Sequence, residues 1–274
     1  MKAMTVDLEI ICVGNELLIG KTLNTNAFWM GKQATTLGAN VKRITVVQDI
    51  VEEIAKVIRE AVKRNPQFIV TSGGLGPTFD DKTLEGVATA FNCKLEVNQK
   101  ALAMVKEKYI EYTKKRNLPQ GEMTLARVKM ATLPEKTEPI QNPVGTAPAV
   151  RLDLNGTVLF ALPGVPSEME AIFTQTIEPL LKEAVGDRLF CEKSMFLKDI
   201  MESQLAPLID VVMAANVGVY IKSHPLGAEN KPHIEIHLTT AGKHEDKPEE
   251  MLTKAMRQLA SLVEENGGKA VAEK

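Results

Sequence analysis

Runs of apolar residues alternate with helical periodicities along the first part of the chain. In chain order, strand and helix patterns alternate over residues 8–14, 24–38, 41–49, 51–64, 67–74 and 80–92. The strand patterns are short and rich in Ile and Val, and the helix patterns place apolar residues three or four positions apart. This alternation predicts a parallel sheet with helices on both faces, because parallel strands need a crossover between them.

The pattern continues with further helices and a hairpin. Helical periodicity is present over residues 98–117 and 122–131, and two apolar runs flank Asn155-Gly156 within residues 149–164. Asn-Gly between alternating apolar runs is a strong signal of a β-hairpin. A helix is predicted over residues 166–185, opened by Pro166 and Ser167.

The order of elements changes near Gly186. The later patterns read strand, helix, strand, strand and helix over residues 193–200, 202–216, 217–225, 232–242 and 247–266. They predict a small α+β unit with a mixed or antiparallel sheet. We therefore expect an α/β domain over residues 1–180 and an α+β domain over residues 187–266, followed by a frayed tail over residues 267–274.

The composition argues against several kinds of partner and site. The net charge of −2 gives no overall electrostatic reason to expect nucleic acid or a membrane surface as partner. Cys12, Cys93 and Cys191 are far apart and form no CxxC pair, which argues against a disulfide framework and a structural zinc site. We find no signal core and no run of about 18 apolar residues, and expect a cytoplasmic protein.

A glycine-rich loop follows the third predicted strand. Gly73, Gly74 and Gly76 lie between that strand and the next predicted helix. Glycines allow backbone N–H groups to converge on an anion, and the helix adds its positive end, so the loop suits a phosphate or pyrophosphate. The GxxxxGK[ST] pattern is absent, and Phe79 stands where a dinucleotide-binding fingerprint needs its third glycine.

Acidic residues follow this loop. Asp80 and Asp81 have an ordinary explanation as helix-capping residues. A carboxylate beside a bound phosphate is repulsive, however, and Mg²⁺ commonly bridges the two. Asp49 ends the second predicted strand and would share a cleft with Asp81 if the second and third strands were neighbours.

A second polar cluster follows the first strand. Asn15 and Glu16 belong on the same edge of the sheet, where Glu16 would bind metal or a ribose hydroxyl, or simply form a turn. Asn24, Thr25 and Asn26 either cap the next helix or contact the ligand.

Four motifs together resemble a known family. The segments GNELLIGKTLNTN, TSGGLGPTFDDKT, NPVGTAP and LPGVPSEM occur in that order. They look like the N-terminal region of the CinA family (competence/damage-inducible protein A), which is similar to the molybdopterin-binding domain of MoaB and MogA proteins. The resemblance is close over about residues 7–175 and extends to about residue 260. It implies a three-layer α/β/α domain that binds a phosphorylated, nucleotide-like ligand.

The resemblance also implies site residues. Asp49 and Asp81 match two acidic positions that matter for chemistry in the relatives, where they would act in catalysis and hold a divalent metal such as Mg²⁺, Mn²⁺ or Co²⁺. Residues 142–148 and 163–169 line the same cleft in the family. The expected ligand-binding residues are Asn15, Glu16, Asn26, Ser72, Gly73, Gly74, Gly76, Thr78, Asp80, Thr83, Gly145, Thr146, Pro163, Gly164 and Ser167.

This chain departs from the family pattern. Asn15 and Asn24 replace aspartates that are common there, and each loses a charge that would hold metal. Full-length CinA proteins carry a further C-terminal domain with nicotinamide mononucleotide deamidase activity. Nothing in this sequence matches that domain, so we expect no deamidase activity.

The second domain resembles a KH-like fold. A nucleic-acid-binding KH module needs a GXXG loop, and residues 218–227 contain none, so we do not expect RNA binding. His233 and His237 share one face of a predicted strand, without the partners of a zinc motif. Surface or dimer contacts explain them better than a metal site.

Three functions stay open at this point. The resemblance favours a metal-dependent hydrolase of a nucleotide pyrophosphate such as ADP-ribose, giving AMP and ribose 5-phosphate. The alternatives are a protein that binds or adenylylates molybdopterin and a non-catalytic nucleotide-binding module. A homodimer is the default assembly, since two-fold symmetry is common among oligomers.

Overall fold

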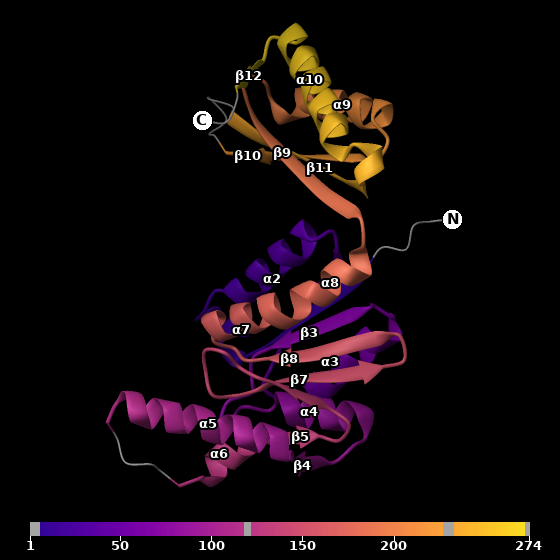
Figure 1. Cartoon of the computed structure of the whole chain (residues 1–274). Helices are drawn as coiled ribbons and strands as arrows, with labels where there is room; N and C mark the ends of the chain where they lie inside the picture. The colour runs from indigo at the N-terminus through magenta and orange to yellow at the C-terminus, as the bar shows by residue number, and fades with distance from the viewer. Residues whose placement is uncertain (1–5, 118–121, 227–232, 272–274) are drawn as a thin grey trace. The chain divides into compact units, whose positions relative to one another are not determined.

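The structure is a computed structural model that describes residues 6–117, 122–226 and 233–271. The chain divides into two compact units between Val185 and Gly186. Figure 1 shows the helices and strands of both units. The first residue of the predicted strand 232–242 and the last three residues of the predicted tail lie outside the described residues.

The first unit contains the predicted strand–helix alternation. Its elements are β1 (Asp7–Val13), α1 (Asn15–Leu18), α2 (Thr25–Thr36), β2 (Asn40–Val47), α3 (Val51–Lys63), β3 (Phe68–Ser72), α4 (Thr83–Phe91), β4 (Leu95–Val97), α5 (Gln99–Lys115), α6 (Leu125–Lys129), β5 (Thr132–Pro134), β6 (Glu138–Ile140), β7 (Ala149–Leu154), β8 (Thr157–Leu162), α7 (Pro166–Ile172), the π-helical turn η1 (Phe173–Ile177) and α8 (Glu178–Val185).

The main sheet has the strand order β2-β1-β3-β8-β7-β6. β2, β1, β3 and β8 run parallel, which confirms the predicted α/β class with a mostly parallel sheet. β7 pairs antiparallel with β8, and the turn between them contains Asn155 and Gly156, as the hairpin signal predicted. The four parallel strands therefore end at one edge of the sheet, where the loops that follow them meet.

Helices cover both faces of this sheet, as Figure 1 shows: α2, α7 and α8 lie on one face, and α3 and α4 lie on the other. Successive side chains of β1 point to opposite faces of the sheet. Ile11 and Val13 pack with Ile54 and Ile58 of α3 and with Val87 of α4 in one buried cluster. Burying each such side chain contributes about 1.5–3 kcal/mol, so both helix layers are needed to cover the sheet.

A buried ion pair lies beside β1. Glu9 has a side chain that is only 3% exposed, and Arg64, just beyond α3, binds it through two nitrogens at 2.7 Å each. The pairing raises the pKa of Arg64 above its ordinary value, chiefly through the hydrogen bond to Glu9. A buried carboxylate without such a partner would strongly destabilise the fold. Arg64 therefore offsets the cost of burying the charge of Glu9.

Several local features differ from the predicted elements. The helix predicted over residues 122–131 is shorter, spanning Leu125–Lys129. The helix predicted over residues 166–185 contains the π-helical turn Phe173–Ile177, whose Phe173 ring meets Trp29 of α2 edge-on at 5.4 Å. The pattern also missed the short helix α1 and the three-residue strands β4, β5 and β6.

The second unit is an α+β sandwich. Its elements are β9 (Arg188–Lys198), α9 (Glu202–Ala215), β10 (Val219–Pro225), β11 (His233–Lys243), the 3-10 turn η2 (His244–Asp246), α10 (Pro248–Glu265) and β12 (Lys269–Val271). The strands form an antiparallel sheet in the order β10-β11-β9-β12. Leu197, Leu238 and Leu259 belong to the buried core between sheet and helices.

The prediction of a frayed tail is wrong for Lys269–Val271. These residues form β12 and pair with β9, with Lys269 opposite Lys198. Pairing to an edge that is already in place gives even three residues a defined conformation, which no local pattern signals. Within the described residues, no helix combines the length and the apolar character needed to cross a bilayer. Cys12, Cys93 and Cys191 are free thiols.

Candidate functional site

A cleft of about 480 Å³ opens where the parallel strands end. Its lining comes from the segments that directly follow β1, β2, β3 and β8, together with Thr146, Ala147 and Met130. This is the edge at which open parallel sheets bind their ligands. The volume is within the usual range for small-molecule sites.

Most of the predicted site residues meet in this cleft. It is lined by Glu16, Asn26, Asp49, Ser72, Gly73, Gly74, Gly76, Thr78, Asp80, Asp81, Thr146, Pro163 and Gly164. Asn15, Thr83, Gly145 and Ser167 do not line it. Asn15 and Thr83 hydrogen-bond residues that do line it, and Gly145 hydrogen-bonds Asn142 behind the wall. Ser167 is exposed in the first turn of α7.

The glycine loop lies closely against the ends of β1 and β8. Gly73 has φ of +105°, and a Cβ atom there would lie 2.3 Å from the Val13 carbonyl oxygen. Its N–H donates to the Leu162 carbonyl at 3.0 Å. A Cβ on Gly164, in the loop after β8, would lie 3.3 Å from the Gly73 Cα. Glycine is required at position 73, because both the conformation and the space exclude a side chain.

The loop presents unpaired donors. Among the described residues, the backbone N–H groups of Gly74, Leu75 and Gly76 have no hydrogen-bond partner. All three residues line the cleft. Successive N–H groups of this kind form a concave site for an anion. The glycine loop therefore has the donors that a phosphate group requires.

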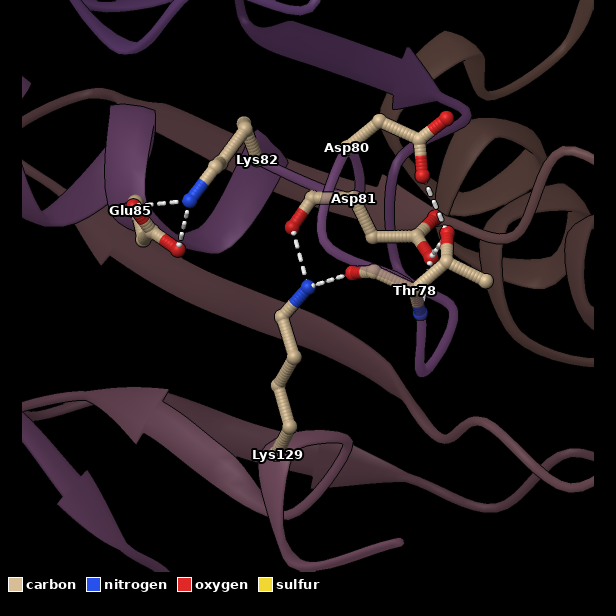
Figure 2. A network of polar contacts seen from close by, with 6 residues as sticks. All are labelled: Thr78, Asp80, Asp81, Lys82, Glu85 and Lys129. Atoms are coloured by element: carbon tan, nitrogen blue, oxygen red, sulfur yellow. Dashed lines mark hydrogen bonds and ion pairs between the residues drawn. The ribbon is translucent and has the colours of Figure 1, made fainter. Parts of the chain in front are cut away.

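Side chains fix the shape of this loop. The buried hydroxyl of Thr83 donates to the Gly73 carbonyl at 2.7 Å, and the Thr83 N–H donates to the Gly74 carbonyl at 3.1 Å. The Asp81 carboxylate accepts from the Thr78 N–H at 2.8 Å and from its hydroxyl at 2.7 Å. A Cβ on Gly76 would lie 2.6 Å from the same carboxylate. Asp81 is thus a bracing group inside the loop (Figure 2).

Three carboxylates of the cleft, those of Glu16, Asp49 and Asp80, influence one another electrostatically. Burial raises the pKa of the Asp49 carboxyl above its ordinary value, and the nearby charges of Glu16 and Asp80 raise it further. The Asn15 N–H, which donates to this carboxylate at 2.7 Å, opposes the rise. The hydrogen bond from Thr78 holds the pKa of Asp80 below its ordinary value. Among the two loop acids, Asp80 is the one whose charge acts on Asp49.

The structure alters one premise of the predicted metal site. The second and third predicted strands, β2 and β3, are not neighbours, because β1 lies between them. Asp49 and Asp81 nevertheless line the same cleft. Within the described residues, no three His, Cys, Asp or Glu side chains are grouped so that they could hold a metal. Metal binding by Asp49 and Asp81 stays a prediction.

Asn26 anchors the wall formed by α2. Its amide donates to the Ser72 hydroxyl at 2.9 Å and to the Gly164 carbonyl at 2.8 Å, which joins α2, β3 and the loop after β8. The Oδ1 atom of Asn26 is buried and lacks a hydrogen-bond partner within the described chain. Asn24 has the capping role, since its side chain accepts from the Ala27 N–H at 3.1 Å.

The opposite wall is a turn held by Asn142 and Glu168. The Asn142 amide donates to the Glu168 carboxylate at 2.7 Å and to the Ala147 carbonyl at 2.9 Å. Its side-chain oxygen accepts from the Gly145 N–H at 2.7 Å. Gly145 leaves room for Glu168, whose carboxylate carbon would be 2.1 Å from a Cβ there. Predicted residue Gly145 thus shapes the wall from behind.

Sequence reasoning missed Lys129 and Met130. Met130 lines the cleft, and Lys129 donates from the far side of the loop to the carbonyl oxygens of Thr78 and, at 2.8 Å, of Asp81. Figure 2 shows the Lys129 side chain reaching up to the loop. Neither residue belongs to a motif, and only the folded chain brings them to the site.

Comparison with known proteins gives the family of this fold. Residues 9–183 match a family model described as a probable molybdopterin binding domain. The match spans more than half of the chain and includes the segments that line the cleft. The chain belongs to this family.

Relatives of this molybdopterin-binding-domain protein match almost its whole length. A protein of Caldivirga maquilingensis is 44% identical over 254 residues, which cover 92% of this chain and 95% of the relative. A protein of Metallosphaera sedula is 41% identical over 266 residues, covering 97% of both chains. Their similarity therefore includes the second unit as well as the family domain.

A solved structure shares the CinA resemblance that the motifs predicted. The protein CinA of Thermoplasma acidophilum, described as having unknown function, is 41% identical, with a TM-score of 0.58. The alignment covers 64% of this chain and 98% of that one. The predicted kinship with CinA and with the molybdopterin-binding domain is confirmed.

Proposed function

We propose that the cleft binds a phosphorylated small molecule of nucleotide or pterin type. The observation that carries this proposal is a set of three N–H groups, at Gly74, Leu75 and Gly76, in a loop that lines a cleft of about 480 Å³. None of the three has a hydrogen-bond partner in the part of the chain that the structure describes. A phosphate accepts from such a set without needing a lysine or arginine. The family's description as a probable molybdopterin binding domain supports the same ligand class.

We further propose that the protein hydrolyses a nucleotide pyrophosphate such as ADP-ribose with the help of a divalent metal. Mg²⁺ is commonly held by one or two carboxylates together with substrate phosphates, and a group of carboxylates beside a phosphate loop has suitable oxygen donors. Asp49 uses Oδ2 to accept from Asn15, which leaves Oδ1 for a cation. Asp80 is the better partner in this conformation, because it accepts from Thr78 only through the hydroxyl and its charge acts on Asp49, whereas Asp81 accepts from both the N–H and the hydroxyl of Thr78.

Each group then has a separate task. The glycine N–H groups hold the phosphate, and Asp49 with Asp80 supplies negative charge for the metal. When bound, the metal would neutralise developing charge and activate water. Asn26 and Ser72 keep the walls formed by α2 and β3 together. Cleavage of the pyrophosphate bond by water would give AMP and ribose 5-phosphate.

Incubation of the purified protein with ADP-ribose tests this proposal. AMP release is followed by chromatography with Mg²⁺, Mn²⁺ or Co²⁺ and with a chelator. We expect release only with metal, and loss of release in Asp49→Asn and Asp80→Asn. Asp81→Asn decides whether Asp80 or Asp81 is the second metal ligand beside Asp49. Activity retained by this variant favours Asp80. The absence of AMP with every metal would refute the hydrolase proposal.

Pterin binding is the second candidate, because the matching family model is described by that ligand. Tight binding of molybdopterin, with ADP-ribose left intact, would favour it; adenylyl transfer from ATP to the pterin would make the protein an enzyme of that class. Saturable nucleotide binding without turnover would indicate a non-catalytic module. A homodimer and a cytoplasmic location complete the proposal, to be checked by light scattering and by cell fractionation.

A further inference from the structure

The glycine loop is held from behind by a lysine that does not line the cleft. Lys129 donates to the carbonyl oxygens of Thr78 and Asp81, the latter at 2.8 Å. It borders a separate pocket of about 50 Å³ on the other side of the loop, together with Gly74, Leu75 and Gly76. A cation at this place therefore acts on the loop and has no direct access to the ligand.

The peptide plane gives this contact a direction. A carbonyl oxygen and the N–H of the next residue point to opposite sides of a trans peptide. When Lys129 holds the Thr78 carbonyl, the N–H of Phe79 is turned away from the lysine. The same holds for the Asp81 carbonyl and the N–H of Lys82. The lysine thus fixes two peptide groups at the end of the loop nearer α4. It acts on the phosphate donors through Asp81, whose carboxylate lies close to Gly76.

Lys129 is itself held in place. It is the last residue of the short helix α6, which begins after Thr124, whose hydroxyl accepts from the Arg127 N–H at 3.3 Å. The Arg127 guanidinium lies 3.8 Å from the centre of the Tyr109 ring on α5. The next residue, Met130, is buried and lines the cleft. This support connects α5 to the loop through α6.

We propose that Lys129 is a positioning residue that preorganises the glycine loop for phosphate. This inference rests on the proposed phosphate-binding function of the cleft. It adds that a group outside the cleft determines phosphate affinity by fixing the backbone that binds it. Lys129 should therefore raise the affinity only for ligands that carry a phosphate group.

Lys82 provides a matched control. It lies beside the same loop, but its ammonium pairs with Glu85 at 2.9 Å and, within the described residues, donates to no loop carbonyl. Figure 2 shows both lysines, one joined to the loop and one to Glu85. Lys82→Met and Lys129→Met remove the same charge near the loop, and only the second removes the contacts to the backbone.

Amide hydrogen exchange of the full chain tests the inference without any ligand. We expect Lys129→Met to speed exchange at Gly73, Thr78 and Asp81, whose N–H groups are hydrogen-bonded amides of the loop. Exchange in the second unit should stay unchanged, and Lys82→Met should leave these three amides as in the wild type. Lys129→Arg, which keeps donors and charge, should restore most of the protection. Unchanged exchange in Lys129→Met, or equal acceleration in both methionine variants, would overturn the positioning role.

Binding of ADP and adenosine, followed by calorimetry, tests the link to phosphate. Lys129→Met should weaken ADP binding about tenfold, the size of one lost charge-assisted contact, and leave adenosine binding unchanged. Lys82→Met should change neither. Equal loss for ADP and adenosine would overturn the phosphate-specific role. If wild-type protein binds no ADP, the nucleotide-binding part of the proposed function fails, while the exchange experiment still decides whether Lys129 orders the loop.

Discussion

The two sheets of this molecule distribute their polar side chains in different ways. In the first unit, polar groups gather beyond the ends of β1, β2, β3 and β8 and line one cleft. In the second, they lie along a strand face, where His224 is opposite Glu235 and Lys222 is opposite His237. Parallel strands all end at the same edge, so their loops converge, whereas antiparallel strands send alternate loops to opposite edges. Sheet direction thus decides where a ligand site forms.

The largest expected difference between the two units is in activity. Asp49→Asn should lower the proposed hydrolysis by about a hundredfold or more, the usual size for losing one charge-stabilising group in an active site. His237→Asn, on the second sheet, should leave the rate unchanged. Both rates are measured as AMP release from ADP-ribose. Slower AMP release by His237→Asn would mean that part of the site lies outside the first unit, and would contradict the difference between the two sheets.

Asp49→Asn should also be no less stable than the wild type. Because burial raises the pKa of Asp49, folding favours the neutral carboxyl. The stabilising contribution is therefore full at low pH and is lost as the pH rises through the pKa of the folded protein. Asparagine is neutral at every pH, so the variant keeps this contribution at pH 7. Urea unfolding at pH 7 checks the sign, and a marked destabilisation would contradict it.

A buried and an exposed ion pair should differ in stability. Arg64→Met leaves the carboxylate of Glu9 buried and should cost about 3 kcal/mol, since Arg64 itself is partly exposed. Lys269→Met breaks the pair with Asp199 in the second unit, whose side chains are 73% and 58% exposed, and should cost less than about 1 kcal/mol. Trp29, the single tryptophan, reports unfolding of the first unit by fluorescence, and hydrogen exchange of the β9 and β11 amides reports the stability of the second. Equal losses would contradict the difference in burial.

Two buried threonines allow a finer comparison. Thr83 donates to the Gly73 carbonyl at 2.7 Å in the first unit, and Thr240 donates to the Gly218 carbonyl at 2.8 Å in the second. Thr83→Val and Thr240→Val should each cost about 1–2 kcal/mol of unfolding free energy. Only Thr83→Val should also weaken ADP binding, because Gly73 belongs to the phosphate loop. Calorimetric titration of both variants measures this; equal affinities would argue against the bracing role.

The smallest expected effect concerns thiols and pH. Burial raises the pKa of Cys12, with a small opposing hydrogen bond from Asn24, so the folded state keeps the thiol neutral. As the pH rises past the ordinary pKa of a thiol, the unfolded chain ionises first, and the free energy of unfolding should fall. Cys12→Ala should reduce this slope. Cys191→Ala, at a half-buried position of the second unit, should reduce it less, as urea midpoints at several pH values would show.

The strands that could be predicted are those with a local signal. Ile and Val runs followed by amphipathic helices predicted β1, β2 and β3, and Asn155-Gly156 predicted the hairpin of β7 and β8. β4 and β5 could not be predicted, because each has three residues and they pair only after α5 has brought distant segments together. β12 depends on β9 in the same way. Their conformations are set by partners rather than by periodicity.

For the site, the sequence predicted the place better than the roles. The loops after the parallel strands were expected at one edge, and most of their predicted residues line the cleft. The roles of the two adjacent acids could not be predicted, because Asp80 and Asp81 both accept from Thr78 and differ in which Thr78 groups they bind. Lys129 is 48 residues from Asp81 in sequence, so only tertiary structure reveals that they meet.

The contact between Gly73 and Gly164 also limits how such a cleft can diversify. A Cβ on Gly164 would lie 3.3 Å from Gly73 Cα, and one on Gly73 would lie 2.3 Å from the Val13 carbonyl. Variation in ligand choice is therefore expected at other lining residues, such as Leu23 and Val165, which are 84% and 50% exposed. A mutant library made to change the ligand should keep both glycines fixed and randomise those two positions.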